Sequence, residues 1–140
     1  MFNFLKKNKK NSFQKIYINS AALLIHAAKI DENYQIAEKE IIKKTLIKLG
    51  VDEKSVDELI EIAEKYEKES NQILGFTKEI KQMDKKFKLK IIETLWQIIY
   101  SDGLADMYET NLMTRLKGLM YLDDKLFAEI KNKVKSSLRK

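Results

Sequence analysis

The chain has 140 residues, no cysteine and no proline, and 44% of its residues are hydrophobic. This length and apolar content fit one folded domain with a substantial core. The absence of cysteine excludes disulfides and thiolate metal sites, and no apolar run reaches the roughly 18–20 residues of a membrane span. We therefore expect a cytoplasmic protein. Because proline is absent and glycine occurs only four times, we expect it to be all-helical.

The formal net charge of +6 is concentrated at the two ends of the chain. Residues 1–15 contain five Lys and residues 131–140 contain five Lys or Arg, and neither segment contains an acid. Removing these ten from the 27 basic residues leaves 17 against 21 acidic residues in 16–130, a net charge of −4. This distribution argues against nucleic-acid binding by the body and assigns any polyanion contact to the tails.

Apolar residues at helical spacing predict seven helices in chain order. With their capping residues, these helices cover about 13–30, 35–49, 52–69, 71–83, 84–100, 106 onward and 123–138. Gly50 and Gly103 are placed to end the second and fifth helices. Aspartates are placed as N-caps of the third, fifth, sixth and seventh helices; these are Asp52, Asp84, Asp106 and Asp123.

Apolar positions recur at an offset of 71 residues, which indicates an internal repeat. The matched pairs include Leu24 with Leu95, Ile25 with Trp96, Ala28 with Ile99, and Ile42 with Met113. We therefore predict an all-α, compact seven-helix bundle made of two pseudo-symmetric three-helix repeats joined by a short helix. Repeat 1 covers about 13–69, the connector helix about 71–83 and repeat 2 about 84–138. Residues 1–12 form a basic N-terminal leader ahead of this single domain, 13–140.

The spacing Asp-x₆-Glu occurs at the same place in both repeats, from Asp31 to Glu38 and from Asp102 to Glu109. Each pair flanks the link between two predicted helices. Asp31 and Asp102 would lie at helix C-termini, where the helix dipole disfavours an anion by roughly 0.3–1 kcal/mol. Each of them therefore needs a partner, either N–H groups of the following helix or a bound cation.

Two interpretations of these acidic links stay open. Asp106-x-x-Glu109 fits a capping box, which would make the second link a well-formed turn and nothing more. The alternative is a metal site whose candidate ligands are Asp102, Asp106, Glu109, Asp31 and Glu38. Carboxylate oxygens suit Ca²⁺ or Mg²⁺, and also Mn²⁺, better than zinc.

Other polar residues favour structural roles. His26, the only histidine, is interpreted as a partly buried helix residue, because no nucleophile constellation accompanies it. Four glutamates at helical spacing predict a solvated acidic face on the third helix; they are Glu58, Glu61, Glu64 and Glu67. No nucleotide-binding or hydrolase motif occurs. The prediction is a protein that is not an enzyme and has no organic cofactor.

Three segments, AALLIHAAKID, GFTKEI and IIETLWQIIYSDGLADMYE, resemble the TerB-like family, the tellurite-resistance-associated helical domain. The resemblance covers about residues 20–138 and is nearest to single-domain members. The family motif DGxxDxxE is matched in full by Asp102, Gly103, Asp106 and Glu109. In the first half Asp31 and Glu38 match, whereas Glu32 replaces the Gly and Gln35 the middle Asp.

The resemblance implies a compact seven-helix fold and acidic residues that bind a divalent cation. It also implies an association with tellurite resistance, stress responses and multiprotein assemblies near the inner membrane face. The leading hypothesis is a non-enzymatic, cation-binding domain that acts in stress response or protein assembly. The alternative is a purely structural interaction scaffold without metal.

The expected partner is a protein, and nucleic acid is not expected. The sequence of residues 1–15 also allows a weak contact with an anionic membrane, because Phe2, Phe4 and Leu5 stand beside lysines. The competing interpretation of this segment is a disordered leader. A cytoplasmic location, with association at the inner face of the membrane, fits both hypotheses.

Overall fold

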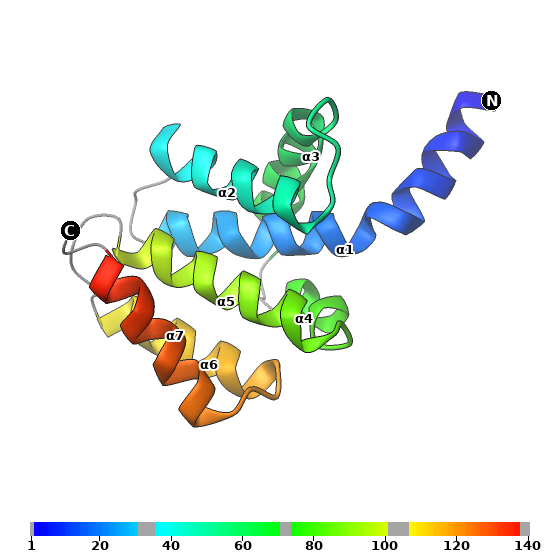
Figure 1. The fold of residues 1–140 in the computed structure, drawn as a ribbon. Coiled ribbons are helices and arrows are strands. Elements are labelled where there is room, and N and C mark those ends of the chain that lie inside the picture. The colour runs from blue at the N-terminus through cyan, green and yellow to red at the C-terminus, as the bar shows by residue number, and fades with distance from the viewer. Residues whose placement is uncertain (1, 31–35, 71–73, 101–106, 138–140) are drawn as a thin grey trace.

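The computed structural model describes residues 2–30, 36–70, 74–100 and 107–137, with side chains described over 15–30, 36–70, 75–100 and 111–137. These residues form seven α-helices and no strand (Figure 1). The helices are α1 (Phe2–Ile30), α2 (Ile36–Leu49), α3 (Val56–Glu69), α4 (Leu74–Ile80), α5 (Lys85–Ile99), α6 (Met107–Leu119) and α7 (Asp124–Ser137). The prediction of an all-helical fold with seven helices is confirmed for this part of the chain.

Helices α1 and α5 form the centre of the bundle. In Figure 1, α2 and α3 lie on one side of this pair and α6 and α7 on the other. From Asn19 to Ala28 every α1 residue except His26 is buried, as expected for a helix segment that is apolar on nearly all sides. Helix α1 contacts α2, α3, α4, α5 and α6, whereas α5 contacts α1, α2 and α7.

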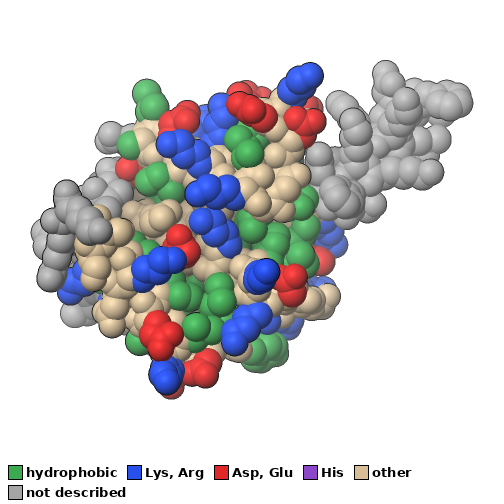
Figure 2. All heavy atoms as spheres, viewed as in Figure 1, with side chains coloured by type: hydrophobic (Ala, Val, Ile, Leu, Met, Phe, Trp, Pro, Cys, Tyr) green, Lys and Arg blue, Asp and Glu red, His purple; other side chains and the backbone are tan. Residues whose placement is uncertain are grey.

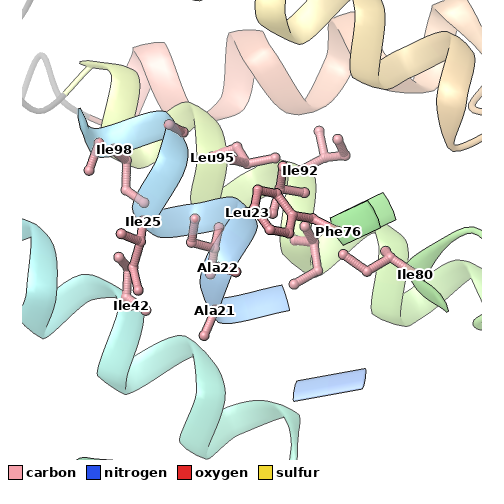
Figure 3. Packing of buried hydrophobic residues seen from close by; sticks show 14 of the residues in the cluster. Ala21, Ala22, Leu23, Ile25, Ile42, Phe76, Ile80, Ile92, Leu95 and Ile98 are labelled. Carbon is pink, nitrogen blue, oxygen red and sulfur yellow. The ribbon is translucent and has the colours of Figure 1, made fainter. Parts of the chain in front are cut away.

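The core joins both halves of the sequence in one apolar cluster. Leu23 of α1 lies close to Phe76 of α4 and Ile92 of α5 (Figure 3). Where α2 meets α5, the buried hydroxyls of Thr45 and Thr94 are 2.9 Å apart. Since Thr94 Oγ1 also donates to the Lys90 carbonyl, Thr45 is the donor between the two threonines. A single core therefore holds both halves of the chain together.

Several predicted helix ends are confirmed. Gly50 has φ +124° directly after α2. The Asp84 side chain caps α5 by accepting from the backbone N of Phe87 at 2.9 Å. Asp123 precedes α7 and accepts from the backbone N of Lys125 at 2.8 Å. These residues satisfy orphan backbone groups at helix ends, which is why the sequence signals were reliable.

Other predicted ends are wrong. Helix α1 begins at Phe2 and not at about residue 13, because residues 2–12 contain no Pro or Gly to stop it. Ser55, not Asp52, holds the N-cap position of α3. Asp52 instead closes a turn, in which its backbone and side-chain oxygens accept from Ser55 N and Lys54 N.

The connector helix ends earlier than predicted, whereas the described part of α5 agrees with the prediction. Helix α4 ends at Ile80 instead of about residue 83, and its predicted start at about residue 71 lies outside the described residues. Helix α5, with Asp84 and Tyr100 as its caps, covers the predicted range of about 84–100. The predicted stop at Gly103 and the predicted cap at Asp106 lie outside the described residues.

The turns that follow α2 and α6 share one hydrogen-bond pattern at the 71-residue offset. Val51 N donates to Leu46 O at 2.9 Å, and Leu122 N donates to Lys117 O at 3.1 Å. Each turn also contains one residue with positive φ, which is Gly50 in the first and Tyr121 in the second. The local likeness is therefore close, and the pseudo-symmetric arrangement of whole repeats stays a prediction.

Candidate functional site

Three of the five predicted metal ligands belong to residues 31–35 and 101–106, which lie between described helices and outside the described part of the chain. Helix α1 ends at Ile30 and α2 begins at Ile36, so the first link holds Asp31. Helix α5 ends at Ile99 and α6 begins at Met107, so the second link holds Asp102 and Asp106. These three aspartates lie outside the described residues. Glu109 is the third residue of α6, but its side chain also lies outside the described part.

Glu38 is the one predicted ligand whose side chain is described. It is the third residue of α2 and is only 5% exposed. A buried carboxylate is costly unless other groups compensate its charge, and the N-terminal end of a helix contributes to this compensation. Glu38 therefore combines two properties of a ligand at the first link, an oxygen donor and withdrawal from bulk water.

The described side chains include no group of three or more His or acidic residues arranged to hold a metal ion. Four of the five predicted ligands are outside that set. The prediction of a cation site at the links therefore stays a prediction.

A second polar cluster, which the sequence did not suggest, joins α1 to α3. Glu67 of α3 is 8% exposed. Its Oε1 lies 2.7 Å from Lys29 Nζ, and its Oε2 lies 3.1 Å from His26 Nδ1. The ring of His26 also packs near Phe76 of α4, at 6.1 Å between centroids. The carboxylate thus accepts from two side chains on one turn of α1. Through these bonds and the ring contact, the cluster connects α1, α3 and α4.

The family of the chain follows from a comparison with known proteins. The sequence model of the family described as "Tellurite resistance protein TerB" matches residues 17–132. The chain belongs to the TerB family. Searches of curated proteins and of solved structures gave no match. The resemblance predicted from the sequence is confirmed, and the matched part of this TerB chain runs from the start of the packed part of α1 into α7.

The predicted solvated face of α3 in the TerB domain is partly wrong. Glu58 and Glu61 are exposed, and Glu64 is half-buried with its carboxylate 3.6 Å from Lys39 Nζ. Glu67 instead lies on the buried face, since it follows Ile60 and Ala63 at helical spacing.

One feature of the TerB sequence could have predicted this cluster. Lys29 and His26 are three residues apart on a helix with otherwise apolar neighbours, and such a pair needs an acidic partner when it packs against another helix.

The His26 cluster has the properties of a structural ion pair more than those of a catalytic centre. His26 and Lys29 are about one-third exposed, with side-chain values of 32% and 40%, and both point to one carboxylate. The described helices of this TerB chain include none that is both long and apolar enough to cross a membrane.

Proposed function

We propose that this TerB domain is a non-enzymatic module that binds a divalent cation at its acidic inter-helix links and acts in protein assembly, in the setting of a stress response. The observation that supports this most directly is the burial of Glu38, a candidate ligand, in the first turn of α2. Membership in a family described by tellurite resistance supports the stress-response part.

The donor chemistry at the links is consistent with a hard cation. Asp31 and Glu38 would supply oxygen ligands at the first link, and Asp102, Asp106 and Glu109 at the second. Oxygen-only sites of this kind prefer Ca²⁺ or Mg²⁺, which also neutralise the repulsion between neighbouring carboxylates. A cation bound at a link would connect the end of one helix to the start of the next. Binding of the cation would therefore make the link more rigid, and a partner would recognise the rigid link.

Calorimetric titration of the metal-free protein with Ca²⁺, Mg²⁺ and Mn²⁺ tests the proposal. We expect saturable heat and a rise in the melting temperature, because a ligand that binds only the folded state stabilises it. Asp102→Asn should weaken binding at the second link and Glu38→Gln binding at the first. Glu58→Gln, which removes an exposed α3 carboxylate, is the matched control. No heat and no thermal shift at millimolar ion would refute the cation part.

A second candidate function, a metal-independent interaction scaffold, is favoured by the distribution of charge. Helix α2 carries four Lys and two Glu, and α5 carries four Lys and one Glu. Helix α3 carries six acidic residues and two Lys. Figure 2 shows a row of basic side chains that crosses the face over α2 and α5. A row of this kind fits an acidic partner surface.

The two candidates differ in how chelation affects partner capture. Purified protein on a resin captures partners from a lysate with and without a chelator. Equal capture of the same protein in both conditions supports the scaffold, whereas loss of capture on chelation supports the cation-dependent module. Lys44→Glu with Lys48→Glu, on the exposed side of α2, should abolish capture if this basic row is the docking face.

A further inference from the structure

A surface pocket of about 300 Å³ lies between α4 and the C-terminal end of α6. The two helices are in contact and lie beside each other in Figure 1. The pocket is lined by Thr77, Lys78, Lys81, Gly118, Leu119 and Tyr121. None of these six described residues is acidic and two are lysines. Its volume is at the lower end of the range for small-molecule sites.

Tyr121, at the rim of this pocket, has an unusual backbone. Its φ is +56°, in the left-handed region that a residue with a large side chain rarely adopts. The equivalent turn after α2 uses Gly50 at the same position, with the same hydrogen bonds. Glycine would therefore satisfy the backbone at 121 as well, and the turn itself does not require tyrosine. Strained residues of this kind concentrate at ligand sites.

The tyrosine side chain is presented to solvent and not packed into the core. It is 76% exposed, although its neighbours Met120 and Leu122 are buried or half-buried. The Lys81 ammonium lies over the ring, 6.0 Å from its centroid, and the exposed fraction shows that most of the residue stays accessible beside it. At Gly118, which lines the pocket, an added Cβ would meet no atom within 4 Å, so the space beside this residue is open. The pocket thus combines an accessible aromatic face with two ammonium groups.

We propose that this pocket binds a nucleotide, with the base stacked on Tyr121 and the phosphate held by Lys78 and Lys81. Aromatic stacking accepts any base, and lysine ammonium groups recognise phosphate as point charges. A flat ring joined to a negative group matches both features of the pocket at once. A free nucleotide and the phosphorylated end of a nucleic acid share this chemistry.

An NMR titration of the ¹⁵N-labelled full chain tests the proposal with AMP, ATP, adenosine, inorganic phosphate, phosphotyrosine and a 5′-phosphorylated tetranucleotide. We expect saturable shifts for AMP or ATP at the residues that line the pocket, with adenosine and phosphate each at least about tenfold weaker. Tighter binding of the tetranucleotide than of AMP would identify a nucleic-acid end as the source. The opposite order would identify free nucleotide, and both orders support the site.

Two variants separate binding from folding. Tyr121→Gly restores the residue type of the equivalent turn and should fold normally, while it weakens AMP binding about tenfold or more. Lys81→Gln should have a similar effect, whereas Lys85→Gln, outside the pocket and with the same change in charge, should have none. Full-strength binding by Tyr121→Gly, equal binding of phosphate alone, preference for phosphotyrosine, or no saturable shift at millimolar nucleotide would each overturn the proposal.

Discussion

Glu67 of α3 provides the carboxylate that pairs with polar groups of α1. Its carboxylate is nearly buried and receives Lys29 and His26 from one turn of α1. We expect Glu67→Gln to lower the free energy of unfolding by about 1–3 kcal/mol, because an amide cannot compensate the lysine charge that the carboxylate now meets. Urea denaturation at pH 7 measures the change. Glu58→Gln, exposed on the same helix, should stay within about 0.5 kcal/mol, and equal effects of the two variants would contradict the structural role.

The sequence suggested the candidate ligands at the links, but it did not suggest the Glu67 cluster. Asp31 and Asp102 lie outside the described residues, so their position after α1 and α5 stays a prediction. Glu67 shares its spacing with Glu64 and Glu61, and that pattern is typical of a solvated face. The spacing from Ile60 and Ala63 puts Glu67 on the buried face of α3, but which α1 residues lie opposite it depends on how the two helices pack. That is a tertiary fact, which a helical pattern alone does not contain.

Gly50 and Tyr121 hold equivalent backbone positions, but we expect opposite responses to substitution. A Cβ at Gly50 would lie 2.9 Å from the Tyr17 hydroxyl oxygen, in addition to the strain at φ +124°. Gly50→Ala should therefore lower the free energy of unfolding by about 1–2 kcal/mol.

The comparison at the second turn is Tyr121→Gly, which should leave the free energy of unfolding unchanged within about 1 kcal/mol, because glycine accepts a positive φ without strain. Thermal unfolding of both variants gives the result. A large loss for Tyr121→Gly would mean that the tyrosine stabilises the turn, and its exposure would then need another explanation.

At the scale of the helices, periodicity predicted the number and order of the elements better than their ends. Asp84 and Asp123 cap α5 and α7 as predicted. Asp52 carries the same signal, yet it closes a turn and leaves the N-cap position to Ser55. An aspartate can bond backbone N–H groups in a turn as well as at a cap. The aspartate alone therefore does not distinguish a helix cap from a turn.

The cap at Asp84 supports a quantitative prediction for α5, the helix that links both halves of the core. Asp84→Ala removes the acceptor for Phe87 N and should lower the free energy of unfolding by about 1 kcal/mol. Asp84→Ser keeps an acceptor at the cap and should retain most of the stability. Chemical denaturation followed by circular dichroism measures both variants. An identical loss in the two would show that the side chain matters for its charge and not as a cap.

At the scale of the whole molecule, net charge concealed how the charges are distributed. Residues 16–130 sum to −4, yet the basic residues concentrate on α2 and α5 and the acidic ones on α3. Several charges also pair between helices, as between Lys43 and Asp57 at 3.3 Å. The composition alone led to the inference that only the tails attract polyanions. The row of lysines over α2 and α5 gives the body a basic surface of its own. Experiments must therefore separate binding by the tails from binding by this surface.

Deleting residues 1–12 separates the contribution of the tail from that of the body. In Figure 1 the N-terminal part of α1 extends away from the other helices. Among the α1 side chains that the structure describes, the first buried one is Asn19, and the family match begins at residue 17. The truncated chain should therefore keep its melting temperature within about 3 °C.

Sedimentation with vesicles that contain anionic lipid then measures binding of the full and truncated chains. The deleted segment carries four lysines, each worth about 1 kcal/mol near an anionic surface. We expect binding to fall at least about tenfold, and to fall further in high salt because the attraction is electrostatic. A full-length variant with these four lysines changed to glutamine should lose as much if charge dominates, and less if Phe2, Phe4 and Leu5 insert. Undiminished binding of the truncated chain would assign membrane contact to the basic face over α2 and α5.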